Sequence, residues 1–192
     1  MKARTLLFAL SLAGCSFFGK QEPLHPQYYD PEPAGGTSGG AASGKSMRMG
    51  HVQGSSHLRE RIAYHVNARE LGFYERRRWT ERPEMYLRRA LTRELFERRG
   101  LTQIASGSAP TLEVELTDFS ELKEPQHAAR IRARVLLVEA RQVRFEHTFE
   151  VSVPVEGKDF DGVPTAFSDA LAQLADQIGE RVIEELPEPP AL

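Results

Sequence analysis

Hydrophobic and polar residues alternate along three runs in the second half of the chain. The apolar members are Leu112, Val114 and Leu116, then Ile131, Ala133, Val135 and Leu137, then Val143, Phe145, Phe149, Val151 and Val153. Alternation with a period of two is typical of strands that bury one face, and short connections at 120–127 and 139–142 predict an antiparallel meander. The polar positions place an arginine-bearing run between two glutamate-bearing runs, and opposite charges on neighbouring strands help to set their register.

Apolar residues at helical spacing predict two helices. The first covers 83–99, with Pro83 in its first turn, Gly100 at its end and a stripe of Leu87, Leu91 and Leu95. The second follows Pro164, and its apolar stripe is Phe167, Leu171, Leu174, Ile178 and Val182. Weaker patterns earlier in the chain predict a strand at 47–51 and two short strands at 62–66 and 71–74, which flank a turn at 67–69.

The predicted order is strands, helix, strands, helix. It indicates a single α+β domain over 46–186, a two-layer sandwich in which a largely antiparallel sheet carries two main helices on one face. Residues 187–192 are a proline-rich tail that cannot continue a helix. A net charge of −2 and a hydrophobic content of 40% suit a folded domain, and about 140 residues is the commonest size for one.

The first fifteen residues have the features of a secretory signal. Lys2 and Arg4 precede a short apolar run that is too short to span a bilayer, which needs roughly 20 residues. Residues 12–15, Leu-Ala-Gly-Cys, resemble the bacterial lipobox. We therefore expect a signal peptide over 1–14 and a lipid-modified Cys15 as the new N-terminus.

Cys15 is the only cysteine of the chain, and acylation explains an unpaired thiol in an exported protein. Two acyl chains already give stable membrane anchoring. Ser16 follows the cysteine where an aspartate would retain the protein in the inner membrane, so we expect an anchor at the periplasmic face of the outer membrane. Residues 15–45 are rich in Gly, Ser and Pro and are predicted to be a flexible linker that reaches roughly 30 Å.

Residues 39–46, Gly-Gly-Ala-Ala-Ser-Gly-Lys-Ser, match the P-loop pattern formally. A P-loop needs a strand before it, and a helix after it whose N-terminus faces phosphate. Here a linker precedes the string, and residues 47–50 are poor helix formers. We attribute the match to linker composition and expect no nucleotide cofactor.

Other candidate chemistry is weak. The histidines at 51, 57, 65, 127 and 147 show no metal-ligand spacing, Asp159 and Asp161 lack the further ligands of a calcium loop, and no serine lies in a nucleophile elbow. We therefore expect no metal, no cofactor and no catalytic residue, so the protein is predicted not to be an enzyme. Trp79 and Tyr64 are expected to be core or edge-packing residues.

The stretch over 59–99 is rich in arginine, with three consecutive arginines at 76–78. It could contact anionic lipid headgroups or an acidic partner. The stretch could instead be a solvated helix face on which glutamates are interspersed with the arginines, and this structural interpretation is favoured.

Several short motifs follow one another in a specific order. Residues 61–64, Arg-Ile-Ala-Tyr, precede the pair Phe73 and Tyr74, and then come Trp79 and, four residues on, Pro83. This order, followed by a strand meander and a final helix, resembles the ABC-type transport auxiliary lipoproteins, the PqiC-like lipoprotein components of MCE-type lipid transport systems. The resemblance covers most of 46–186, together with the lipobox.

The resemblance implies a non-catalytic, membrane-anchored periplasmic protein that docks to an MCE-domain protein. That partner acts with an ABC permease and ATPase to move phospholipid or other hydrophobic molecules across the envelope. We expect no nucleic-acid partner, and homo-oligomerisation is left open. The alternative is a structural or assembly lipoprotein of an outer-membrane complex, similar to the plug-like subunit of a lipopolysaccharide-export complex.

Overall fold

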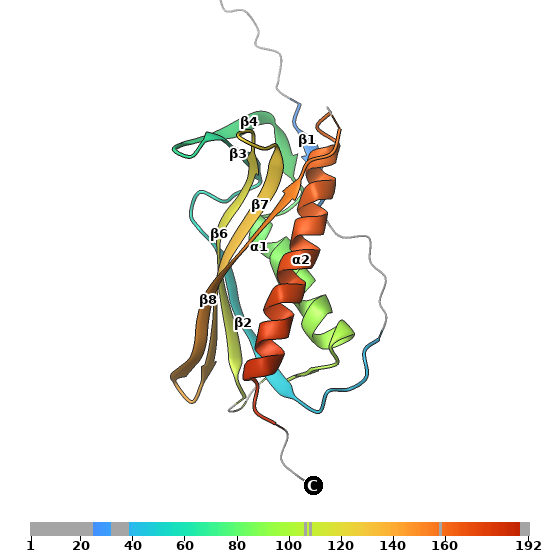
Figure 1. Cartoon of the computed structure of the whole chain (residues 1–192), viewed down its shortest axis with the longest axis vertical. Coiled ribbons are helices and arrows are strands. Elements are labelled where there is room, and N and C mark those ends of the chain that lie inside the picture. Colours follow the sequence, from blue (N-terminus) through green and yellow to red (C-terminus); the bar gives the residue numbers. More distant parts are fainter. Residues whose placement is uncertain (1–24, 32–38, 106, 108, 158, 189–192) are drawn as a thin grey trace, which may run out of the picture.

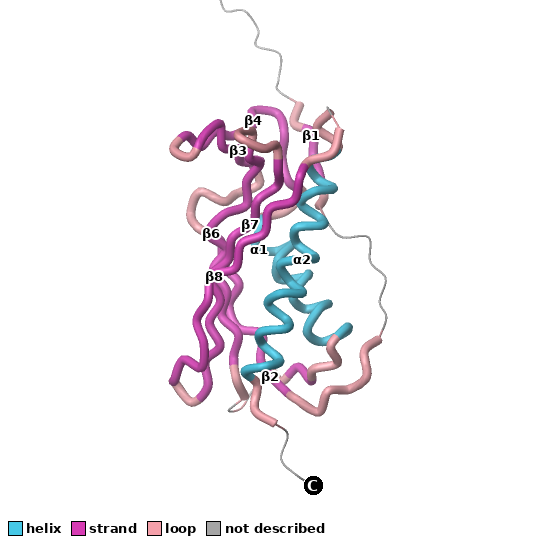
Figure 2. The backbone as a smooth tube through the Cα atoms, viewed as in Figure 1, coloured by secondary structure: helices cyan, strands magenta, loops and turns pink. Residues whose placement is uncertain are grey.

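The computed structural model describes residues 25–31, 39–105, 107, 109–157 and 159–188. Figure 2 shows two layers, with the sheet on one side and both helices packed against one of its faces. The predicted α+β sandwich is thereby confirmed. The predicted signal peptide and Cys15, residues 16–24 and 32–38 of the predicted linker, and the end of the tail lie outside the described residues.

The sheet has eight strands in the described residues and is mixed. The strands are β1 Gln27–Tyr29, β2 Ser46–Gly54, β3 Arg61–Asn67, β4 Glu70–Trp79, β5 Thr102–Gln103, β6 Thr111–Leu122, β7 Ala128–Glu139 and β8 Gln142–Pro154. The helices are α1 Pro83–Thr92, which continues as a π-helical segment Arg93–Arg98, and α2 Gly162–Glu185. The meander β6–β7–β8 and the hairpin β3–β4 are antiparallel, whereas β1, β2 and β5 add parallel pairings.

Strand β6 is the centre of the sheet. One of its edges pairs with β7 along its length. Its other edge is shared end to end, because β2 pairs with its first half and β3 pairs with residues 120–122. As a result β3, β4 and β1 form one end of the domain, the upper end in Figure 1, and α2 ends at the opposite end.

The core lies between the sheet and the helices. All five residues of the predicted α2 stripe are fully buried, as are the three leucines of the first helix. Trp79, at the end of β4, packs edge-on against Phe119 and Phe167, whose rings stack with centroids 4.4 Å apart. Phe119 reaches this core because a bulge between Leu116 and Asp118 shifts the alternation of β6.

The structure corrects several sequence predictions. The helix predicted over 83–99 changes to π-helical geometry at Arg93; Gly100 follows it with φ of +63°, a conformation that favours glycine. Val143, predicted on the buried face, is 54% exposed. A bulge shifts the β7–β8 register between Leu137 and Val138, so Val143 pairs with Val138 and lies on the other face.

Part of the predicted 15–45 linker contacts the domain. Residues 27–29 form β1, which pairs in parallel with residues 77–79 of β4. Further on, the Gly40 amide donates to Glu97 and the Ser43 amide donates to Gly100. Proline and glycine content predicted a flexible segment, but edge pairing with an existing strand can order a short segment without a strong local preference.

Candidate functional site

The arginine-rich stretch 59–99 divides into two halves with different surroundings. In the helical half, several arginines have carboxylate partners: Arg89 lies 2.6 Å from Glu81, and Arg99 Nε donates to Glu94 Oε1 at 2.6 Å. Glu94 is only 3% exposed and also pairs with Arg98. Glutamates are interspersed with the arginines of this half as the favoured interpretation expects, but Glu94 is buried, so the face is not solvated throughout.

The other half is not helical. Arg76, Arg77 and Arg78 lie on strand β4, and residues 59–78 contain six arginines against three glutamates. In the part of the chain that the structure describes, none of these six arginines forms an ion pair with a carboxylate. Arg61 even lies opposite Arg78 in the β3–β4 ladder, an arrangement in which like charges are destabilising.

A cleft lies on this hairpin, on the side of the sheet that carries the helices and next to the start of α2. It consists of two adjoining hollows of about 840 Å³ and about 430 Å³ that share Tyr74, Arg77 and Lys123. We call it the Tyr74 cleft. The larger hollow is also lined by Gln27, Tyr64, Phe73, Glu75 and Arg76, and the smaller one by Glu121, His127, Asp159, Phe160 and Val163.

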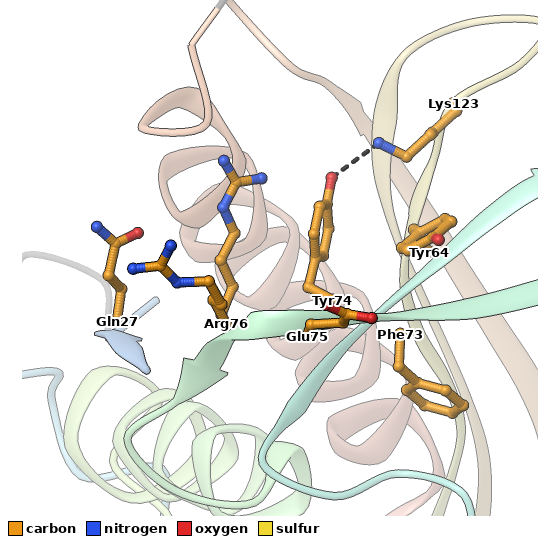
Figure 3. Close-up of a pocket in the computed structure, with 8 residues that line it drawn as sticks. Gln27, Tyr64, Phe73, Tyr74, Glu75, Arg76 and Lys123 are labelled. Atoms are coloured by element: carbon orange, nitrogen blue, oxygen red, sulfur yellow. Dashed lines mark hydrogen bonds between the residues drawn. The ribbon is translucent and has the colours of Figure 1, made fainter. Parts of the chain in front are cut away.

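Buried Glu121 organises the polar side of the cleft. Its carboxylate is 2% exposed, and it accepts a hydrogen bond from the Tyr74 hydroxyl at 2.7 Å and has His127 Nε2 2.7 Å from its other oxygen. Lys123 Nζ donates to the Tyr74 oxygen at 2.7 Å and lies 3.6 Å from Glu121. Figure 3 shows Tyr74 and Lys123 pointing toward one another across the cleft.

The pKa of Tyr74 is raised above the ordinary tyrosine value. Burial is the largest cause, and the hydrogen bond and negative charge of Glu121 add to it. A phenol held protonated in this way donates to Glu121 throughout the physiological pH range. The network therefore fixes the Tyr74 ring rather than supplying an acid or a base.

Aromatic rings form the other wall of the cleft. The Tyr64 and Tyr74 ring centroids are 4.9 Å apart, and Phe160 meets Tyr74 edge-on at 5.2 Å. The Arg77 guanidinium lies over the Phe160 ring at 3.8 Å and over the Tyr74 ring at 4.7 Å. Arg76 lies beside Gln27 at the far end of the cleft (Figure 3). The cleft thus presents cations held on aromatic faces.

Only some of the residues considered from the sequence belong to this cleft. Tyr64, His127 and Asp159 line it, whereas Trp79 is fully buried in the core. Among the described residues, no three His, Cys, Asp or Glu side chains gather where they could hold a metal ion. The contribution of Glu121, Lys123 and Phe160 was missed, because they are brought together by β6, the loop after it and the turn before α2.

The lysine of the P-loop-like string has a structural role. Lys45 Nζ donates to the carbonyls of Ile183 and Leu186 at 3.1 Å and 3.2 Å, at the C-terminal end of α2. A cation there stabilises the negative end of the helix dipole. Ser46 begins a strand instead of a helix, so the string lacks the geometry that phosphate binding needs.

Comparisons with known proteins match this fold. A family model described as "ABC-type transport auxiliary lipoprotein component" matches residues 29–179. No curated protein matches the chain.

Three solved structures show the same fold. The crystal structure of protein XCC0632 from Xanthomonas campestris, of the family DUF330, has a TM-score of 0.69 at 20% identity and covers 83% of this chain and 95% of its own. A crystal structure described only as an uncharacterized protein has a TM-score of 0.66 at 16% identity, covering 82% and 99%. The structure of hypothetical protein CT253 from Chlamydia trachomatis has a TM-score of 0.51 at 10% identity and covers 72% of this chain and 95% of its own.

Proposed function

Because the chain belongs to the family of ABC-type transport auxiliary lipoproteins, we propose that it is the non-catalytic, lipid-anchored component of an MCE-type ABC lipid transport system. The observation that carries this proposal is the family match over 29–179, which includes every described strand and helix except the first two residues of β1 and the last six of α2. In the proposed role the domain binds an MCE-domain protein. ATP hydrolysis belongs to the ATPase of the same system.

The chemistry of the Tyr74 cleft supports binding rather than catalysis. No serine, threonine or cysteine is among the described residues that line it. Both oxygens of Glu121 are engaged by fixed partners, so this carboxylate is not available as a general base. A cleft with fixed aromatic rings and arginines on their faces is suited to hold a ligand or partner without transforming it.

Membrane attachment in this proposal comes from acylation of Cys15. Among the helices in the described residues, none is both long and apolar enough to cross a bilayer. Each buried methylene of an acyl chain contributes about 0.8 kcal/mol, and two chains give stable anchoring. We place the anchor in the outer membrane, with the domain in the periplasm, because serine follows the cysteine.

The test is capture of the native complex. A C-terminal tag lies far from the Tyr74 cleft, because α2 ends at the opposite end of the domain from β1 (Figure 1). Envelopes are crosslinked, solubilised gently and captured through the tag, and the co-purifying proteins are identified by mass spectrometry. A second tagged lipoprotein of the same membrane serves as the background control.

Enrichment of an MCE-domain protein with its ABC permease over that control is the expected result. If an outer-membrane β-barrel dominates and no MCE protein is enriched, the transport role is wrong and the structural or assembly role is correct. A parallel intact-mass measurement tests the anchor, with Cys15→Ala as the variant that cannot be acylated.

A further inference from the structure

Strand β1 determines which end of the domain lies nearest the anchor. Gln27 and Tyr29 pair with Arg77 and Trp79, the Thr80 amide donates to Tyr29, and the Tyr29 ring packs edge-on against Phe160 at 4.8 Å. Only residues 16–26 separate Cys15 from β1. The twelve steps from Cys15 to Gln27 span at most about 43 Å when fully extended, at 3.3–3.6 Å each, so the β1 end is held within that distance of the acylated residue.

The surface at this end is unlike the rest of the molecule. The hairpin β3–β4 with its flanking Arg59 and Glu60 carries six arginines and three glutamates, while the whole chain has a net charge of −2. Two of the four large hydrophobic side chains that are exposed in the described residues lie here: Tyr28 on β1, 62% exposed, and Leu71 on β4, 36% exposed. Arginines interspersed with exposed aromatic and aliphatic residues are typical of surfaces that lie at the membrane interface.

Arginines elsewhere in the sheet have a different environment. On β7, Arg132 and Arg134 pair with Glu150 and Glu146 of β8. In the cleft, Arg76 and Arg77 form no ion pair with any carboxylate among the described residues, although Glu75 and Asp159 line the same hollows. Glu121 is buried and already paired with Lys123 and His127. The two guanidinium groups therefore keep their capacity for an external anion.

We propose that the β1–β4–β3 end of the domain faces the bilayer that holds the Cys15 anchor, and that Arg76 and Arg77 contact the phosphodiester groups of anionic phospholipids there. This inference rests on the acylation of Cys15 in the proposed function. Each basic residue near an anionic membrane surface attracts the protein to it. Anchor and arginines together hold the domain in one orientation, with the β7–β8 turn directed away from the membrane.

The experiment uses the acylated full chain, in which a newly introduced cysteine is the only free thiol. Ala68→Cys places it at the β3–β4 turn, and Ala140→Cys places it at the β7–β8 turn at the opposite end; both positions are exposed. Each variant is labelled with an environment-sensitive fluorophore and reconstituted into vesicles that contain a phospholipid with a spin-labelled headgroup. The control vesicles are phosphatidylcholine alone, and the anionic test vesicles are phosphatidylcholine with 30% phosphatidylglycerol.

The expected result is quenching at position 68 and not at position 140 in the anionic vesicles. The variant Arg76→Glu/Arg77→Glu should lose the quenching at position 68, down to the level at position 140. The matched charge reversal Arg141→Glu/Arg144→Glu, at the far end of the domain, should leave it unchanged. The fluorescence of the single, buried Trp79 verifies that each variant is folded.

Other outcomes overturn the inference in distinguishable ways. Equal quenching at both turns, or more at position 140, refutes the orientation. Quenching at position 68 that persists in phosphatidylcholine alone and in Arg76→Glu/Arg77→Glu refutes the arginine–phosphodiester contact. An absence of quenching on both kinds of vesicle refutes the membrane contact and favours an acidic protein as the partner of the arginines. If the intact mass shows that Cys15 carries no acyl chains, the attachment in the proposed function is wrong; that result is distinct from a failure of the proposed arginine–lipid contact.

Discussion

Replacement of the buried carboxylate of the Tyr74 cleft, Glu121→Ala, should destabilise the domain more than the same replacement at any exposed glutamate of the sheet. The substitution removes the acceptor of the Tyr74 hydroxyl and the partner of His127, both at 2.7 Å, at a position that is 2% exposed. Leaving buried donors unpaired costs about 1–3 kcal/mol for each such group. The side chains of His127 and Lys123 are 40% and 38% exposed, so water can replace part of what they lose.

We therefore expect a loss of about 2–3 kcal/mol in the free energy of unfolding, the lower part of the range that the contacts allow. For a domain of this size that corresponds to a fall of roughly 4–12 °C in Tm. Urea denaturation followed by Trp79 fluorescence measures it, since Trp79 is the only tryptophan and is fully buried. An unchanged m-value shows that the comparison is between the same two states.

The matched control is Glu150→Ala, which also removes a strand glutamate paired with an arginine, but where both side chains are 42% exposed. Exposed ion pairs contribute about 0–1 kcal/mol, so this variant should lose at most that amount. If Glu121→Ala costs no more than Glu150→Ala, the Glu121 network does not hold the cleft together, and the physical account of its rigidity is wrong.

Three further variants test neighbouring parts of the structure. Gly72→Ala should cost about 1–3 kcal/mol and displace the Tyr64 ring from the cleft, because a Cβ at Gly72 would lie 2.5 Å from the Tyr64 ring; denaturation and a near-UV circular dichroism spectrum measure both effects. Tyr74→Phe should remove a phenol that ionises above the ordinary tyrosine range in an alkaline titration read by tyrosinate absorbance. Because burial and Glu121 raise the Tyr74 pKa in the folded state, Tyr74 contributes stability that is fully present below the ordinary tyrosine pKa of about 10 and is lost as pH rises further. The wild type should therefore lose stability more steeply than Tyr74→Phe above pH 10. Glu94→Ala should cost about 2–4 kcal/mol in urea denaturation, because it removes the 3% exposed carboxylate that pairs with Arg98 and Arg99, and Arg99 in turn pairs with Asp176 of α2.

Periodicity predicted the fold where burial is one-sided and continuous. The α2 stripe and the leucines of α1 lie in the core, and the three strands of the meander pair as expected. Irregularities within elements were not predictable in the same way. The bulge after Leu116 and the bulge beside Val143 each reverse the face of the following residues, and a bulge has no strong local sequence signal. Strand β1 was missed because its pairing with β4 is a long-range contact.

The candidate site was predictable only in part, for a related reason. Tyr64 and Tyr74 lie on neighbouring strands of one hairpin, and the pattern of residues 61–74 suggested that hairpin. Glu121 comes from the end of β6 and Phe160 from the turn before α2, so their approach to Tyr74 depends on how the whole sheet is assembled. The spacing of residues along the sequence therefore does not predict that Glu121 and Phe160 approach Tyr74.

The two halves of the arginine-rich stretch show why composition alone could not decide its role. In a helix, a glutamate three or four residues away brings its carboxylate to the same face, and Glu94 pairs with Arg98 in this way. In a strand, the residue opposite on the neighbouring strand determines whether an arginine has a carboxylate partner, and the residue opposite Arg78 is Arg61 of β3. The same sheet gives every arginine of β7 a carboxylate partner, so unpaired arginines are not a general property of this protein. Their concentration beside β1, which follows Cys15 by only eleven intervening residues, is the observation from which we infer that the hairpin contacts the membrane.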